Sequence, residues 1–165
     1  KNKNKISAIG EAGLDYSQNG DTANQKKIFE KIIALAEKIN KPIIVHSRKA
    51  EADCVDMLES SKSKKIIMHC FCGRKFLVKK IIDNGWFLTI PANVVRSKQF
   101  QFIAQEAPVT QLFCETDAPY LSPFKDQRNE PAFVAESYKK LAEIKGMELK
   151  EVINNIWMNW QKTFQ

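Results

Sequence analysis

Two short stretches decide the fold, Pro42-Ile-Ile-Val-His-Ser-Arg48 and Lys65-Ile-Ile-Met-His69. In each of them an uninterrupted apolar run ends at a histidine, and the chain contains only these two histidines. Apolar runs of this length, without polar alternation, are typical of parallel strands that are buried on both faces. The two stretches therefore predict two buried strands with His46 and His69 at their carboxyl ends.

Three further apolar runs extend this pattern along the chain. The five predicted strands are Ile6–Ile9, Pro42–Val45, Lys65–Met68, Trp86–Ile90 and Gln111–Cys114. Helical periodicity is found over residues 22–40, 50–60, 74–84, 98–106, 130–145 and 149–162. Alternation of strands and helices predicts repeated βαβ units and a parallel sheet. A doubly wound sheet and a β/α barrel both fit this order.

The first helix has the clearest pattern. Thr22 is its expected N-cap. Its expected buried stripe consists of Ile28, Ile32, Leu35, Ala36 and Ile39. Further along the chain, Gly85 and Gly146 follow helical stretches, at positions where glycine commonly ends a helix.

Potential metal ligands stand at the ends of four of the five strands. Glu11 comes shortly after the first strand and Asp117 shortly after the last, while His46 and His69 follow the second and third. The carboxyl ends of parallel strands form the edge where active sites assemble, so we expect these side chains to converge. A single such residue is more often a hydrogen-bonded or helix-capping group, but four in matching positions favour a shared site. Imidazole and carboxylate groups suit Zn²⁺, Mg²⁺ or Mn²⁺.

Other catalytic chemistries find less support. The sequence contains no G-x-S-x-G elbow, no P-loop and no dinucleotide-binding glycine fingerprint. His69 and Cys70 could be imagined as a Cys–His pair, but adjacent residues of a strand point to opposite faces. Glu115 and Asp117 are two residues apart and could share a face, which would place a helper carboxylate beside a ligand or base.

The composition is that of an ordinary globular protein, with 165 residues, 44% of them hydrophobic and 27% charged. The net charge of +7 favours polyanions such as nucleic acids, and it equally favours solubility. No apolar run approaches the roughly 20 residues of a membrane span, and no signal peptide is recognisable. We therefore expect a cytoplasmic protein without membrane contact, whose four cysteines are reduced thiols.

The order of the motifs resembles that of the TatD-type metal-dependent deoxyribonucleases. The segments that carry the resemblance are Ile9-Gly-Glu-Ala-Gly-Leu-Asp-Tyr16, Pro42-Ile-Ile-Val-His-Ser-Arg48, His69-Cys-Phe-Cys-Gly73, Glu115-Thr-Asp-Ala-Pro-Tyr-Leu121 and Arg128-Asn-Glu-Pro131, with Asn159 and Phe164 in a closing helix. The match runs in order from about residue 6 to the end of the chain.

This resemblance implies a TIM-like barrel of the amidohydrolase type with a site for two divalent metals. Glu11 would bridge the two metals, and His46 and His69 would complete one of the two sites. Asp117 would bind the other metal and help to orient or deprotonate the attacking water. Arg48 and Arg128 are the expected phosphate contacts, although surface salt bridges account for them almost equally well.

The chain also departs from the family pattern. The His-x-His motif with which the family opens is absent, and five strands cannot close an eight-stranded barrel. We expect one domain over residues 1–165 that holds the C-terminal five βα units and is N-terminally incomplete. Either a piece of about 90 residues is missing, or an N-terminal fragment or second chain completes the barrel. Ala12, Cys72 and Pro91-Ala-Asn93 are smaller departures.

Three functions follow as hypotheses. The first is a metal-dependent phosphodiester hydrolase, a deoxyribonuclease that trims single-stranded DNA from an end with a metal-activated water. The second is a metal hydrolase with a small ester or amide substrate, against which the charge of +7 argues mildly. The third is a catalytically impaired, truncated barrel that binds nucleic acid or a partner.

Overall fold

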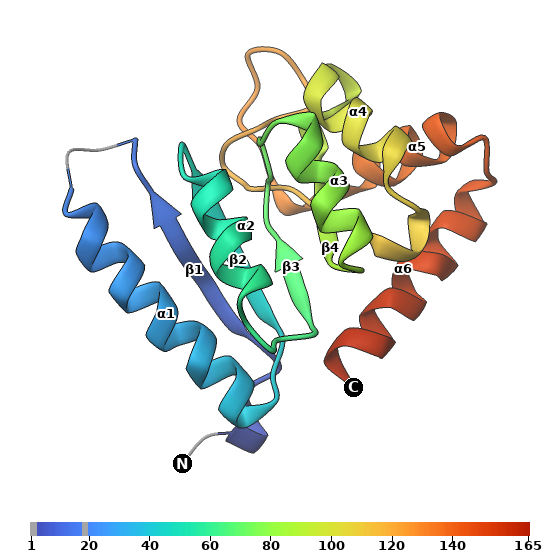
Figure 1. The fold of residues 1–165 in the computed structure, drawn as a ribbon. Helices are drawn as coiled ribbons and strands as arrows, with labels where there is room; N and C mark the ends of the chain where they lie inside the picture. The colour runs from blue at the N-terminus through green and yellow to red at the C-terminus, as the bar shows by residue number, and fades with distance from the viewer. Residues whose placement is uncertain (1–2, 18–19) are drawn as a thin grey trace. The chain divides into compact units, whose positions relative to one another are not determined.

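A computed structural model describes residues 3–17 and 20–165, and Figure 1 shows how the chain runs. The chain divides into two compact units. The first comprises Lys1–Phe87 together with Thr163–Gln165, and the second comprises Leu88–Lys162. The expectation of one domain over residues 1–165 stays a prediction.

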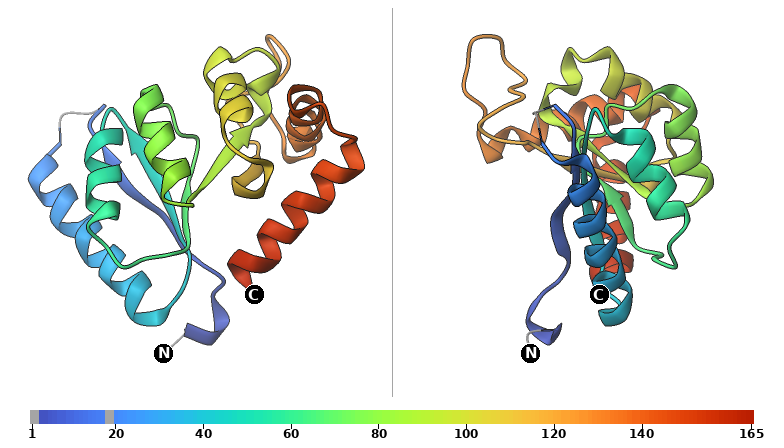
Figure 2. Two further views of the ribbon diagram at one scale, coloured as in Figure 1. Left: turned by 45° about the vertical axis from the view of Figure 1, so that its right-hand side comes forward. Right: turned by 60° about the vertical axis from the view of Figure 1, so that its left-hand side comes forward.

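The first unit is a three-stranded parallel sheet with three helices. Its elements after a short 3-10 turn at Lys3–Lys5 are β1 (Ile9–Asp15), α1 (Thr22–Ile39), β2 (Ile43–Arg48), α2 (Glu51–Glu59), β3 (Ile66–Met68) and α3 (Lys75–Asp83). The strands lie in the order β1–β2–β3, with Gly13 opposite His46 and Val45 opposite Met68. Figure 2 shows α1 and α2 on the same face of the layer that β1 and β2 form, as right-handed βαβ crossovers require.

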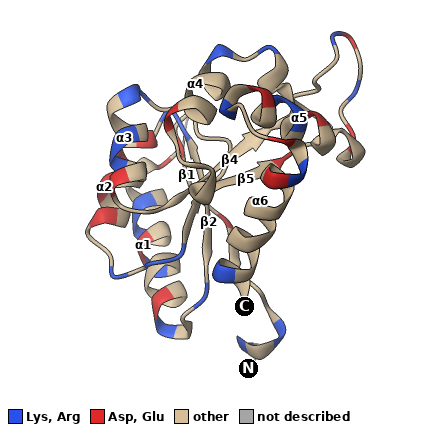
Figure 3. Ribbon diagram, turned by 90° about the vertical axis from the view of Figure 1, so that its right-hand side faces the viewer, with Lys and Arg blue, Asp and Glu red and all other residues tan. Residues whose placement is uncertain are grey.

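The core of the first unit comes from the central strands and from one face of each helix. All three residues of β3 are buried, and β2 alternates buried with half-buried positions. The largest fully buried side chains of this unit are Leu14, Phe29, Ile43, Leu58, Ile66, Met68, Phe71 and Ile81. Charged residues of both signs occur along α1, α2 and α3 (Figure 3). Lys80 of α3 pairs there with Asp56 at 3.3 Å and Glu59 at 2.8 Å of α2.

The predicted N-cap and the predicted buried stripe of helix α1 are both wrong in part. The N-cap is Asp21, whose carboxylate accepts the backbone N–H of Asn24 at 2.9 Å, and Thr22 is the first helical residue. The buried residues are Phe29, Ile33 and Ala36, so of the predicted stripe only Ala36 is fully buried. Ile28 and Leu35 are 47% and 48% exposed. The helix carries two neighbouring apolar rows, and periodicity alone does not say which row faces the sheet.

The first strand also differs from its prediction. It begins where the predicted strand ends, at Ile9, and continues through Gly10 and Glu11 to Asp15. The glycines explain the difference, since they interrupt the apolar run but permit a close approach to β2. A Cβ on Gly13 would lie 1.8 Å from the carbonyl oxygen of His46. Glu11 is therefore a residue of the strand and does not follow it.

The second unit contains two parallel strands and the helices that follow them. Its elements are β4 (Phe87–Pro91), the 3-10 turn Ala92–Val95, α4 (Lys98–Glu106), the 3-10 turn Val109–Gln111, β5 (Leu112–Glu115), the 3-10 turn Pro131–Phe133, α5 (Val134–Lys145) and most of α6 (Leu149–Phe164). Strands β4 and β5 pair with Leu88 opposite Leu112. The Asn159 amide of α6, which is almost fully buried, donates to the carbonyl oxygens of Val109 and Leu112, each at 2.8 Å.

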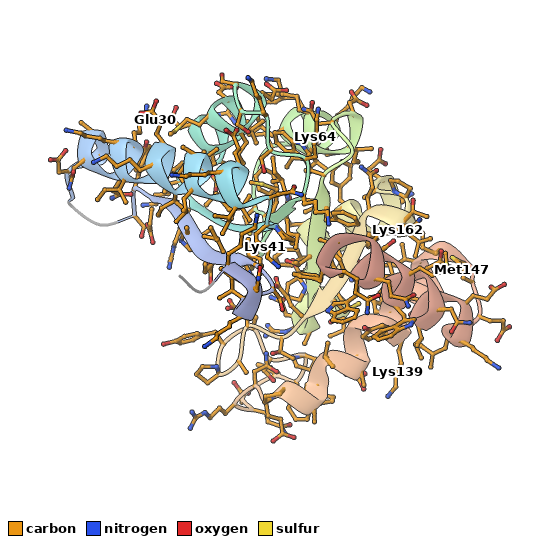
Figure 4. All side chains as sticks on the ribbon, turned by 90° about the horizontal axis from the view of Figure 1, so that it is seen from below. Glu30, Lys41, Lys64, Lys139, Met147 and Lys162 are labelled. Atoms are coloured by element: carbon orange, nitrogen blue, oxygen red, sulfur yellow. The ribbon has the colours of Figure 1, made fainter. Side chains whose placement is uncertain are left out.

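The helix ends agree with the sequence pattern. Gly85 follows the C-cap of α3 with φ +72°, and Gly146 ends α5 with φ +61°. Figure 4 views the chain from below, and two of its labelled residues, Lys41 and Lys64, precede β2 and β3. They mark the amino-terminal edge of the first sheet. The candidate ligands belong to the opposite edge. None of the described helices is both long enough and apolar enough to cross a bilayer.

Candidate metal centre

Three of the predicted ligands converge in the first unit. The Oε1 atom of Glu11 lies 2.8 Å from Nδ1 of His46 and 3.5 Å from Nε2 of His69. One ligand atom from each of the three side chains lies within 4.8 Å of the other two. The two imidazole rings are stacked with their centroids 6.4 Å apart. The side chain of His69 is the most enclosed, with 14% exposed against 44% for Glu11.

Strand register brings these side chains together. Glu11 lies on β1, His46 on β2, and His69 is the first residue after β3. The backbone N–H of His69 still donates to the carbonyl oxygen of Val45 at 2.9 Å, so the third ligand is held by the sheet although it follows the strand. Gly13 pairs with His46, and the register of β1 against β2 shifts between Ile9 and Ala12, so Glu11 meets His46 and His69 although it lies two residues before the pairing partner of His46.

Asp15 is a further residue of this cluster, and the sequence analysis did not single it out. Its Oδ2 atom lies 3.5 Å from Nε2 of His46, so the two ring nitrogens of His46 face two different carboxylates. Ser17 donates its hydroxyl and its backbone N–H to Oδ1 of Asp15, and these bonds lower the pKa of that carboxyl. The sequence spacing could have indicated Asp15, because it lies four positions after Glu11 and residues at even offsets share one face of a strand.

The donor set fits a divalent metal ion. Two imidazoles and a carboxylate are a set that Zn²⁺ binds, and Mn²⁺ or Mg²⁺ accept the carboxylate oxygens. The ligand atoms of the three groups are close enough to share one ion. Three protein donors leave coordination positions for water and substrate. A cavity of about 500 Å³ opens beside them, lined by Glu11, Asp15, His46 and Gln25 together with Ala12, Gly13 and Gly20.

Arg48 belongs to the same unit. It is the last residue of β2, is exposed, and its carbonyl oxygen accepts the backbone N–H of Tyr16 at 2.9 Å. Its side chain is therefore available at the edge that carries the cluster. Its contact with phosphate stays a prediction.

Asp117 and Arg128 lie in the second unit, in the segment between β5 and α5. Asp117 has φ +59°, and its carbonyl oxygen accepts the backbone N–H of Tyr120 at 2.9 Å. Arg128 is exposed and lines a cavity of about 530 Å³ with Ala118, Pro119, Asn129, Glu130 and Pro131. The buried Asn129 amide fixes this segment by donating to the carbonyl oxygen of Thr116 at 2.7 Å. The roles of Asp117 and Arg128 in a shared site stay predictions.

The cysteines form no disulfide. All four lie within the described residues and are free thiols, Cys54 buried and Cys72 exposed. Burial raises the pKa of Cys54 to about 12. Cys72 donates its thiol to the carbonyl oxygen of Cys70 at 3.4 Å, so the C-x-C pair makes a local contact that needs no metal.

The protein is built from parallel βα units, and imidazole and carboxylate donors of neighbouring strands form a candidate metal site. This combination is typical of metal-dependent enzymes with a β/α barrel. A family model described as TatD related DNase matches residues 1–165. The chain belongs to this family.

Individual relatives agree with this assignment. Deoxyribonuclease TATDN3 of Homo sapiens is 35% identical over 167 residues, which cover 98% of this chain and 61% of that protein. The uncharacterized metal-dependent hydrolase YabD of Bacillus subtilis (strain 168) is 34% identical over 168 residues, which cover 98% of this chain and 66% of that protein. The chain thus spans less than two thirds of the length of either relative.

The solved structures show the same fold. YJJV, a TatD homolog from Escherichia coli K12, matches with a TM-score of 0.89 at 23% identity, and the match covers 97% of this chain and 64% of that one. A TatD family hydrolase from Entamoeba histolytica matches with a TM-score of 0.84 at 24% identity and covers 99% of this chain. The TIM-like barrel prediction, with five βα units in this chain, is confirmed against the doubly wound alternative.

Proposed function

We propose that the protein is a metal-dependent phosphodiester hydrolase that removes nucleotides from an end of single-stranded DNA. The observation that carries this proposal is the convergence of Glu11, His46 and His69 at the carboxyl edge of β1, β2 and β3. The family match and the name of the human relative, a deoxyribonuclease, support the choice of DNA. The net charge of +7 favours a polyanionic substrate.

Each residue of the cluster has a proposed role. His46 and His69 would hold one divalent ion, and Glu11 would bind that ion and contribute to the site of a second one. When bound, such ions supply Lewis acidity and lower the pKa of coordinated water. Asp15 faces the nitrogen of His46 that Glu11 does not approach, and so holds the ring in one orientation.

Two further roles extend the proposal beyond the cluster. Asp117 would bind the second ion and would accept the proton of the attacking water. Arg48 and Arg128 contact the phosphate, because a guanidinium group matches two phosphate oxygens at once. Zn²⁺, Mg²⁺ and Mn²⁺ are the candidate ions for this set of donors.

The test is hydrolysis of end-labelled single-stranded DNA by this chain with Mg²⁺, Mn²⁺ or Zn²⁺, run beside an EDTA control. We expect metal-dependent shortening from one end, with a loss of at least 100-fold in rate for His46→Ala, a loss of the size usual for a catalytic metal ligand. Lys38→Ala, an exposed change on α1, is the matched control and should cleave like the unaltered chain. Cleavage that survives EDTA or His46→Ala would rule the proposal out.

The net charge of +7 also fits a second candidate, a protein that binds DNA without turnover. In that case DNA binding would be salt-sensitive and unchanged by EDTA, and no shortened product would form with any of the three metals.

A further inference from the structure

The first unit holds a second cavity that the proposed chemistry does not use. It has a volume of about 420 Å³, and its walls come from the segments that follow β1, β2 and β3. The residues that matter for its chemistry are Tyr16, Lys49, Glu51, Asp53, Arg74 and Phe76. We propose that this cavity is a nucleotide subsite, where one base of single-stranded DNA stacks on Phe76 and its phosphate contacts Lys49 and Arg74. The inference deepens the proposed function and rests on it.

The position of the cavity links it to the metal centre. Lys49 is the third residue after the ligand His46, and Arg74 is the fifth residue after the ligand His69. Three residues of extended chain span at most about 11 Å, so the Lys49 backbone stays within that distance of His46. The cavity beside the cluster is lined by residues of β1 and β2, and the second cavity by residues that follow these two strands and β3. A strand of DNA cleaved at the cluster therefore has a neighbouring nucleotide within reach of the second cavity.

The two carboxylates that line the cavity, those of Asp53 and Glu51, form no ion pair with Lys49 or Arg74 among the described residues. The Asp53 carboxylate is occupied by Lys26 at 2.8 Å and by the hydroxyl of Tyr16 at 2.8 Å. Glu51 accepts the backbone N–H of Lys49 at 3.2 Å. Within the described part of the chain, the side chains of Lys49 and Arg74 make no ion pair, and both residues are exposed. A phosphate group would therefore meet two cations that no carboxylate of the described residues neutralises through an ion pair.

Phe76 supplies the second element of recognition. It lies in the first turn of α3 and is 55% exposed, whereas the next two residues, Leu77 and Val78, are buried at 4% and 1%. The helix is thus anchored by its neighbours, and the Phe76 ring contributes little to the core. An exposed ring at the wall of a cavity is a surface on which any base can stack, as in proteins that bind single strands without sequence preference.

An exposed aromatic ring beside two cations favours single-stranded DNA over other ligands. A duplex keeps its bases stacked and paired, so it cannot place one base in a cavity without paying to unstack it. A volume of about 420 Å³ lies in the range of small-molecule sites. A free nucleotide has the same chemistry as a nucleotide within a strand, so the experiment compares the two.

The test is fluorescence anisotropy of a labelled single-stranded oligonucleotide, titrated with the whole chain in EDTA over a series of salt concentrations. We expect Phe76→Ala to weaken binding about tenfold, the size of one lost stacking contact, and Phe76→Trp to retain it. Arg74→Gln should reduce the slope of log affinity against log salt by about 0.7, as one lost phosphate contact does for a single strand. Competition with a mononucleotide then shows whether the cavity needs a neighbouring phosphate.

Two controls match these changes. Leu35→Ala removes a similarly exposed apolar side chain from α1, and Lys38→Gln removes a cation from the same helix. Both should bind DNA like the unaltered chain. If Phe76→Ala and Arg74→Gln also bind like it, or if duplex and single strand bind equally in every variant, the subsite is ruled out.

Hydrolysis of a small phosphodiester, bis(p-nitrophenyl) phosphate, keeps the two proposals separate. This substrate reports on the metal centre and is too small to depend on a neighbouring subsite. If it is cleaved while all variants bind DNA alike, the subsite fails and the proposed function stands. If no metal supports its cleavage but Phe76→Ala still weakens DNA binding, the proposed function fails and the subsite stands as a binding site only.

Discussion

At the scale of single residues, the surroundings of His46 are the most informative feature of the site. One ring nitrogen faces the ligand Glu11, and the other faces Asp15, which Ser17 holds in place. A ligand that is oriented from a second side loses less freedom when it binds an ion. The arrangement predicts that Asp15 contributes to metal affinity through the orientation of His46.

The first prediction tests this contribution. Asp15→Asn keeps the shape of the side chain and removes its charge, so metal affinity should fall by about 10- to 100-fold, as is typical for groups that orient a ligand. Competition with a metal-binding dye measures the affinity. Asp83→Asn is the control, because Asp83 pairs with exposed Lys79 at 3.0 Å on α3 and is not a residue of the cluster. Equal affinities in the two variants would show that Asp15 has no influence on His46.

The second prediction concerns the pH dependence of thiol reactivity. Burial raises the pKa of Cys54 to about 12, so this thiol stays protonated at pH 8. At pH 8, a maleimide should modify exposed Cys72 quickly and Cys54 only after unfolding in urea. Mass spectrometry of the Cys72→Ser variant measures the rate at which maleimide labels the other three cysteines. Rapid labelling of Cys54 in the folded variant would contradict the burial of this residue.

At the scale of elements, the close packing of strand β1 against β2 depends on Gly13. Gly13 lies opposite His46, and a Cβ there would meet the His46 carbonyl oxygen at 1.8 Å. Because that atom belongs to the backbone of the neighbouring strand, no side-chain rotation relieves the contact. Any larger residue must push β1 and β2 apart, and with them the ligands Glu11 and His46.

The third prediction follows from this contact. Gly13→Ala should lower the free energy of unfolding by about 3 kcal/mol, the upper end for overpacked sites, and weaken metal binding at the same time. Urea denaturation and dye competition measure the two effects. Gly85→Ala is the matched control: a Cβ there meets nothing within 4 Å, so only its φ of +72° is strained. The control should cost about 1 kcal/mol and leave metal binding unchanged.

The elements also show what the sequence could and could not predict. Five strands, the helix that follows each of them and the two glycines that end helices were predictable, because apolar runs and turn residues report them directly. Strand β1 was placed too early, since Gly10 and Gly13 conceal a strand whose backbone packs closely. The buried row of α1 was misassigned, because Ile28 and Leu35 are as apolar as Phe29 and Ile33.

The candidate site was predictable to a similar extent. His46 and His69 could be found because each ends an apolar run, and Glu11 because it stands near another run. Asp15 was missed, because it belongs to a strand that the sequence pattern did not extend far enough. Asp117 and Arg128 were named from their order in the chain, and order alone does not give their distances from the cluster.

At the scale of the whole molecule, β1 is an edge strand of the first sheet. Among the described residues, β1 pairs with β2 on one edge only. On α1, Ile28 and Leu35 are 47% and 48% exposed, and Ile32 and Ile39 between and beyond them are half-buried. These four side chains form one row of the helix. We propose that an N-terminal fragment or a second chain covers this edge, as closure of a barrel requires.

The fourth prediction concerns this row. Without a covering segment, the exposed isoleucine and leucine should drive self-association at high concentration. The double change Ile28→Lys and Leu35→Lys should abolish it and leave the free energy of unfolding within about 0.5 kcal/mol, because both side chains are exposed. Sedimentation velocity and urea denaturation measure the two quantities. Ile33→Lys, at a buried position of the same helix, should instead unfold the unit. A double variant that still self-associates would assign the contact to another surface.

The cluster has one more consequence, which concerns folding and not catalysis. Glu11 and His46 are 35 residues apart in the chain, and His69 belongs to a third strand further on. An ion held by all three ties β1, β2 and β3 together at one end, much as a covalent cross-link would, and closes long loops that an unfolded chain leaves open. Loading the protein with metal should therefore slow amide hydrogen exchange first in β1, β2 and β3.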